Sequence, residues 1–136
     1  MKNSPLSAAL SWKVLCLIAL LLLLDTFAQI FFKVAVTDLG EFPFENFTEI
    51  EKYIFNLITN LYVIGGVIAL IFALFTWLAL ISKVNLSFAH PMTSLVYVTI
   101  PLCASWLLHE QLSWHQIIGI VIIVVGVFII SSDEMH

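Results

Sequence analysis

Four long apolar segments dominate this sequence and restrict the folds that it can adopt. They run approximately over residues 14–36, 57–80, 86–108 and 114–130. Each is close to the roughly 20 residues that an α-helix needs to cross the hydrocarbon core of a bilayer. Of the residues, 62% are hydrophobic and 10% are charged, so a globule of this size would have too little polar surface. We therefore predict an all-α membrane protein with four transmembrane helices.

The four segments predict a single transmembrane domain over residues 1–136. We expect its helices at approximately 14–36, 53–82, 86–108 and 114–131, with an acidic, aromatic loop at 37–52. The phenylalanines of that loop favour the headgroup level of a bilayer. The first segment is interpreted as a retained helix, because its apolar run is too long for a signal peptide and no clear small-residue cleavage site follows it.

Capping motifs mark two of the expected helix starts. Asn46 and Thr48 are each followed three residues later by a glutamate, so the second helix is expected to begin in water before it enters lipid. Ser113 and Gln116 have the same spacing at the start of the fourth helix. Glu110, shortly before that start, is interpreted as a solvated acid that the helix dipole stabilises.

The five basic residues are all lysines, and they divide between the two expected membrane faces. Lys2, Lys13 and Lys83 belong to one face, and Lys33 and Lys52 belong to the other. The positive-inside rule then slightly favours both termini in the cytoplasm. The formal net charge is −4 and no basic patch is present, so we expect no nucleic-acid partner.

Asp25 is the most unusual residue of the first apolar segment. At a rise of about 1.5 Å per residue it lies roughly 16 Å from the Val14 end of a span of about 30 Å. An acid at this depth costs about 2.5–3.5 kcal/mol, and such acids usually face a bundle interior or a watery cavity used by ions, protons or substrate. The alternative is a protonated aspartate that only hydrogen-bonds a neighbouring helix.

Asp25, Gln29 and Lys33 form a polar stripe, because their four-residue spacing places them one above another on a helix. The stripe runs from mid-membrane to one interface. Lys33 would attract a lipid phosphate, Gln29 would bond sugar hydroxyls, and Asp25 would meet an amine or carry a proton. The alternative for Lys33 is a snorkelling membrane anchor.

Pro91 removes a backbone donor early in the third helix, so the turn at His90 and Pro91 is suited to lining a cavity. A charged His90 would donate to a phosphate oxygen, and the alternative is a hydrogen bond between helices. The spacing of the four histidines predicts no metal site. We expect neither a cofactor nor a catalytic residue.

Small residues occur on one face of two expected helices. Gly119 and Gly126 share a face of the fourth helix, and Gly65, Ala69 and Ala73 share a face of the second. Small residues let helix backbones approach each other closely in lipid. Because four short helices enclose little volume, we expect a dimer, with Gly119 and Gly126 at its interface.

Residues 83–132 resemble the second half of small members of the drug/metabolite transporter superfamily, which is EamA-like. The likeness is strongest to the four-helix subunits of the aminoarabinose-phosphoundecaprenol flippase. Their Gly-Ile-Ala-Tyr-Pro-Met-x-Ser-Leu run is similar to SFAHPMTSL at 87–95, and HEQLSWHQIIG also matches. Upstream, an Ala-x-Gln-x-x-x-Lys pattern is similar to Ala28, Gln29 and Lys33 only in part, because Gln29 directly follows Ala28. The resemblance covers about two thirds of the chain and is strongest over 85–132.

The chain is also similar to the small multidrug resistance exporters of the same superfamily. These carry a glutamate eight residues before a lysine in helix one, the spacing of Asp25 and Lys33 here. Their glycine pair in helix four mediates dimerisation and resembles Gly119 and Gly126. Two positions depart from that pattern, since these exporters have a tyrosine in place of His90 and a tryptophan in place of Thr93.

Together, the residues and the resemblance predict a non-enzymatic, multi-pass transporter of the bacterial inner membrane. Its expected activity is to flip a polyprenyl-phosphate-linked sugar or a related lipid. The alternatives are a proton-coupled exporter of small cations and a non-transporting membrane assembly subunit. The expected partners are a membrane lipid, such as an undecaprenyl-phosphate-linked sugar, and a second copy or a related four-helix protein. The residues expected to bind substrate or protons are Asp25, Gln29, Lys33, His90, Thr93 and Tyr97.

Overall fold

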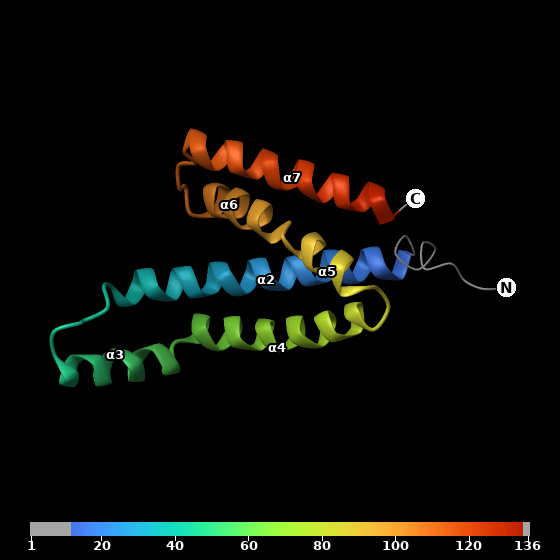
Figure 1. Ribbon diagram of the computed structural model, residues 1–136. Helices are drawn as coiled ribbons and strands as arrows, with labels where there is room; N and C mark the ends of the chain where they lie inside the picture. Colours follow the sequence, from blue (N-terminus) through green and yellow to red (C-terminus); the bar gives the residue numbers. More distant parts are fainter. Residues whose placement is uncertain (1–11, 135–136) are drawn as a thin grey trace.

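The computed structural model describes residues 12–134, and this part of the chain folds into helices joined by short connections (Figure 1). Four stretches are long and apolar enough to cross a membrane: Trp12–Leu39, Leu61–Ile81, Leu86–Leu107 and Trp114–Asp133. The predicted all-α membrane fold with four spanning helices is therefore confirmed. Lys2, used above for orientation, lies outside the described residues.

The helices pack as a small bundle around α2. In chain order they are α2 (Trp12–Leu39), α3 (Phe47–Thr59), α4 (Leu61–Ile81), α5 (Leu86–Thr93), α6 (Val96–Leu107) and α7 (Trp114–Glu134). Figure 1 shows α4 antiparallel to α2 on one side, and α5 with α6 between α2 and α7 on the other. The last helix, α7, thus forms an outer edge of the single chain.

Close packing of α4 on α2 depends on two glycines. A β carbon added to Gly66 would lie 2.6 Å from the ring of Phe32, and one added to Gly65 would lie 3.0 Å from the ring of Phe31. Ala73, two turns further along α4, is buried. The small-residue face of the second predicted helix is therefore used inside the chain, where it lets two backbones approach.

The second predicted helix, expected over 53–82, is divided at Asn60 into α3 and α4. The Asn60 backbone is extended, and its side-chain oxygen accepts a hydrogen bond of 2.9 Å from the backbone N–H of Tyr62. Asn46 precedes α3, as the cap pattern predicts, but its side chain makes no capping hydrogen bond with a described residue. The helix begins six residues before the expected boundary, because α3 is an amphipathic helix and not part of the apolar run.

The third predicted helix, expected over 86–108, is divided where α5 ends at Thr93 and α6 begins at Val96. Pro91 lies just before this break. The Thr93 hydroxyl donates to the His90 carbonyl at 2.7 Å, and the Ser94 hydroxyl donates to the Pro91 carbonyl. Local hydroxyl groups thus satisfy carbonyls at the break, which lets irregular backbone persist at membrane depth.

The capping box at the start of α7 is confirmed. The backbone N–H of Ser113 donates to Gln116 Oε1 at 2.8 Å, and the backbone N–H of Gln116 donates to Ser113 Oγ at 3.3 Å. These reciprocal bonds fix the point where the chain turns into the last spanning helix.

Candidate functional site

The residues of the polar stripe on α2 line two cavities at different depths. Asp25 lines a cavity of about 260 Å³, which we call the central cavity. Gln29 and Lys33 line a cavity of about 230 Å³, which we call the interfacial cavity because Lys33 lies in the last two turns of α2. The three predicted residues therefore lie on one side of α2 but belong to two neighbouring spaces.

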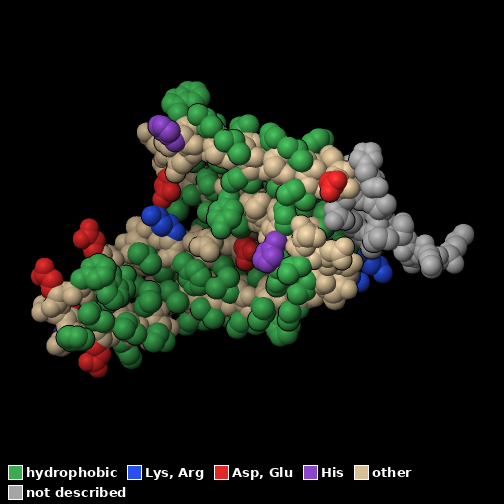
Figure 2. Space-filling view, in the orientation of Figure 1, with side chains coloured by type: hydrophobic (Ala, Val, Ile, Leu, Met, Phe, Trp, Pro, Cys, Tyr) green, Lys and Arg blue, Asp and Glu red, His purple; other side chains and the backbone are tan. Residues whose placement is uncertain are grey.

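The central cavity lies between α2, α4 and α5, and it combines one carboxyl group with an imidazole and a hydroxyl. Its lining residues are Leu21, Asp25, Leu70, Ala73, Leu74, Trp77, His90 and Thr93. The structure thus brings three of the predicted residues, Asp25, His90 and Thr93, to one cavity. Figure 2 shows acidic and histidine surface together in the middle of an otherwise largely apolar face. A group with both charge and hydrogen-bonding capacity would find partners there.

Trp77 is a cavity residue that the sequence analysis missed. Its ring centroid lies 5.0 Å from that of His90, with an interplanar angle of 48°. A signal for it was present, because Trp77 follows Ala73 by four residues and so continues the Gly65, Ala69 and Ala73 face of α4. The ring gives the cavity an aromatic wall close to Asp25.

The interfacial cavity contains a pair of opposite charges. Its lining residues are Gln29, Ile30, Lys33, Ile100, Ala104, Leu108 and Glu110. Lys33 Nζ lies 3.5 Å from Glu110 Oε1, and the two side chains are 58% and 47% exposed. Glu110 was interpreted from the sequence as a solvated acid near a helix start. Glu110 is exposed in the structure, and it also forms an ion pair with a predicted site residue, which the sequence did not predict.

Thr26 and Thr99 link α2 to α6 and are sequence neighbours of cavity residues. Thr26 directly follows Asp25 on α2, and Thr99 directly precedes Ile100 on α6. Their hydroxyl oxygens are 2.8 Å apart, which is a hydrogen bond between two spanning helices. The pair therefore joins α2 to α6 beside Asp25 of the central cavity and Ile100 of the interfacial cavity.

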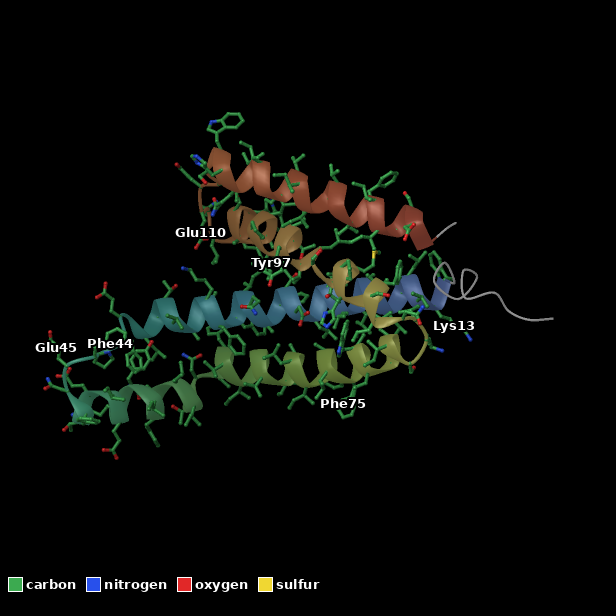
Figure 3. All side chains as sticks on the ribbon, in the orientation of Figure 1. Lys13, Phe44, Glu45, Phe75, Tyr97 and Glu110 are labelled. Carbon is green, nitrogen blue, oxygen red and sulfur yellow. The ribbon has the colours of Figure 1, made fainter. Side chains whose placement is uncertain are left out.

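The remaining predicted residues lie elsewhere on the molecule. Tyr97 is 64% exposed on α6, away from the described lining of both cavities, and is labelled in Figure 3. Gly119 and Gly126 lie on α7, where an added β carbon would meet no other described atom within 4 Å. Among the described residues, no three His, Cys, Asp or Glu side chains lie together as metal ligands would.

Comparison with known proteins identifies similar sequences. The model of the EamA-like transporter family matches residues 4–132. The "Probable 4-amino-4-deoxy-L-arabinose-phosphoundecaprenol flippase subunit ArnF" of Proteus mirabilis is 32% identical over 113 residues, which are 81% of this chain and 85% of that protein. Flippase subunit ArnE of Erwinia tasmaniensis, described in the same words, is 38% identical over 68 residues, 50% of this chain.

The match to the Erwinia tasmaniensis protein spans 63% of that relative's length, so it covers less than two thirds of it. A third relative, the ArnE subunit of Proteus mirabilis, is 29% identical over 87 residues, which are 64% of this chain and 72% of that protein. No solved structure matches the chain significantly.

Proposed function

The chain belongs to the EamA-like transporter family, and from this premise we propose that it is a flippase subunit for a polyprenyl-phosphate-linked sugar. The names of its relatives support this proposal, because they describe flippase subunits for an aminosugar linked to phosphoundecaprenol. The protein would act in the bacterial inner membrane as a dimer, with a second copy or a related four-helix subunit.

The observation that carries the proposal is the succession along α2 of two cavities, each with polar groups in a mostly apolar lining. A lipid-linked sugar phosphate needs a place for its phosphate near the headgroup level and a polar path for its sugar through the bilayer. Lys33 in the interfacial cavity supplies a positive charge at the end of the span, and Gln29 beside it supplies an amide. Asp25 continues the polar path to mid-membrane, about 12 Å further along the helix.

Each residue then has a distinct role in the proposed transport. Lys33 attracts the phosphate as a point charge, and Gln29 hydrogen-bonds sugar hydroxyls. In the central cavity, the Asp25 carboxyl group binds an ammonium group on the sugar or carries a proton. His90 and Thr93 add hydrogen-bonding groups beside it.

A second candidate function is the proton-coupled export of small organic cations. The observation that favours it is the Trp77 ring in the same cavity as Asp25. An aromatic face attracts a cation, and a neighbouring carboxylate adds charge complementarity. Binding of such a cation at Asp25 would displace a proton, which gives this candidate a measurable signature.

The test is transport by the purified protein in liposomes that contain an undecaprenyl-phosphate-linked aminosugar. We expect Asp25→Asn to abolish flipping and to leave membrane insertion intact. Asp38→Asn is the matched control, because Asp38 is an exposed acid near the end of the same helix. Normal flipping by Asp25→Asn would contradict the role assigned to the carboxyl group.

Binding measurements with the cation tetraphenylphosphonium and with undecaprenyl phosphate distinguish the three candidate functions. An exporter of cations would release protons when it binds this probe, and a flippase subunit would bind undecaprenyl phosphate instead. A protein that stabilises a larger assembly without transporting would do neither. Native mass spectrometry of protein purified from membranes would give the subunit count and the co-bound lipid in one measurement.

A further inference from the structure

The ion pair between Lys33 and Glu110 occupies the position that the proposed function assigns to a phosphate. Lys33 lies near the end of α2. Glu110, which is labelled in Figure 3, lies in the connection between α6 and α7. Nζ and Oε1 are 3.5 Å apart across the interfacial cavity. Among the described lining residues, these two are the charged ones, so the cavity is close to electrically neutral while they face each other.

Two features restrict the backbone near Glu110. His109, directly before it, has a φ of 55°, which is the left-handed region that a non-glycine residue rarely adopts. Three residues after it, the capping box of Ser113 and Gln116 begins α7. Glu110 therefore lies on a short, locally restricted connection between α6 and α7, from which its carboxylate reaches Lys33 of α2.

The ion pair is weak enough for a phosphate to replace the Glu110 carboxylate at Lys33. Both side chains are about half exposed, and ion pairs of this kind contribute little net free energy because solvent screens them. A phosphate group offers several charged acceptor oxygens, which form strong charge-assisted hydrogen bonds with an ammonium group. A bound phosphate would therefore compete effectively with the carboxylate for Lys33.

We propose that Glu110 is an internal competitor for the substrate phosphate: it holds Lys33 when no phosphate is bound and is displaced when one binds. Glu110 would thus set the affinity of the interfacial cavity and favour release of the lipid after transport. This inference rests on the proposed function, because it requires Lys33 to bind a phosphate. It adds a specificity-determining residue outside the polar stripe, and it gives a role to Glu110 within the HEQLSWHQIIG run.

The experiment measures binding of undecaprenyl phosphate to the full chain in phosphatidylcholine nanodiscs. We expect Glu110→Gln to tighten binding by about 1.4- to fivefold, the range given by the loss of one half-exposed ion pair. Glu45→Gln is the matched control, since it removes the same charge from an exposed acid in the loop before α3. Binding by this control should equal that of the unmodified protein.

Lys33→Gln distinguishes the inference from the function on which it rests. We expect this change to weaken binding, and we expect Glu110→Gln to have no further effect when Lys33 is already replaced. If Lys33→Gln binds normally, the proposed phosphate site itself is wrong. If Lys33→Gln weakens binding but Glu110→Gln leaves it unchanged or weakens it, the phosphate site stands and the competitor role of Glu110 is overturned.

Discussion

The side chains of Thr26 on α2 and Thr99 on α6 form a hydrogen bond of 2.8 Å that joins the two helices. Thr26 is buried, and the Thr99 hydroxyl also lies 3.2 Å from the Val96 carbonyl. An arrangement in which Thr99 donates to Val96 and accepts from Thr26 satisfies both hydroxyls. The bond thus ties the break of the third span to the helix that carries the polar stripe.

Replacing either threonine with valine should lower stability, because the hydrogen bond between the two helices is lost. Hydrogen bonds between membrane helices contribute about 0.6 kcal/mol on average and up to about 1.7 kcal/mol. We expect Thr26→Val and Thr99→Val each to cost an amount in this range, and the double variant to cost less than the sum. The free energy of unfolding in mixed micelles measures this.

Thr37→Val is the control for the threonine pair. Its hydroxyl donates to the Lys33 carbonyl within the same helix, so its loss breaks no contact between helices. We expect a smaller effect there. Strict additivity of Thr26→Val and Thr99→Val would mean that the two hydroxyls do not interact.

Gly66→Ala should destabilise the fold, and Gly126→Ala should not. The added β carbon of the first variant would lie 2.6 Å from the Phe32 ring, whereas that of the second would meet no described atom within 4 Å. Overpacking of this kind typically costs about 1–3 kcal/mol. Equal unfolding free energies for the two variants would show that the α2–α4 contact is looser than the structure describes.

Much of the fold could be predicted from the sequence, because one physical requirement decides it. A chain in lipid must satisfy its backbone hydrogen bonds internally, so long apolar runs become helices. The same reasoning about depth singled out Asp25, and the lost donor of Pro91 singled out its neighbour His90. Both residues line the central cavity.

One contact between residues distant in sequence and one local helix break were not predicted. The Lys33–Glu110 pair joins opposite halves of the chain, and helical spacing gives no information about such a contact. The break at Asn60 was missed because apolar residues continue on both sides of it, and Asn60 acts through a local cap. Hydropathy reports depth in the membrane, but it does not report which helix faces are neighbours.

The connection that carries Glu110 should be sensitive to the residue at 109. His109 has a positive φ, which costs an L-amino acid about 1–2 kcal/mol relative to glycine. We expect His109→Gly to be at least as stable as the unmodified protein, and His109→Val to lose about 1 kcal/mol or more, since a β-branched side chain fits this conformation poorly. Thermal unfolding in detergent would compare them. Equal stability of the glycine and valine variants would show that the positive φ at residue 109 does not constrain the backbone next to Glu110.

Association of two chains should depend on the glycine face of α7. Gly119 and Gly126 lie seven residues apart on the outer helix, with open space in front of both within the described chain. A leucine at either position would separate two closely packed helices, so we expect Gly119→Leu and Gly126→Leu to reduce the dimer fraction in detergent. Native mass spectrometry or crosslinking measures that fraction.

Val121→Leu provides the control for association, because Val121 is an exposed residue on another face of α7. It should leave the dimer fraction unchanged. We also expect all three variants to fold. A β carbon added at either glycine would meet no described atom within 4 Å beyond the neighbouring backbone of α7. If both glycine variants still dimerise fully, the contact lies on another surface. The small-residue face of α4 is not that surface, because Gly65 and Gly66 already pack against the Phe31 and Phe32 rings of α2.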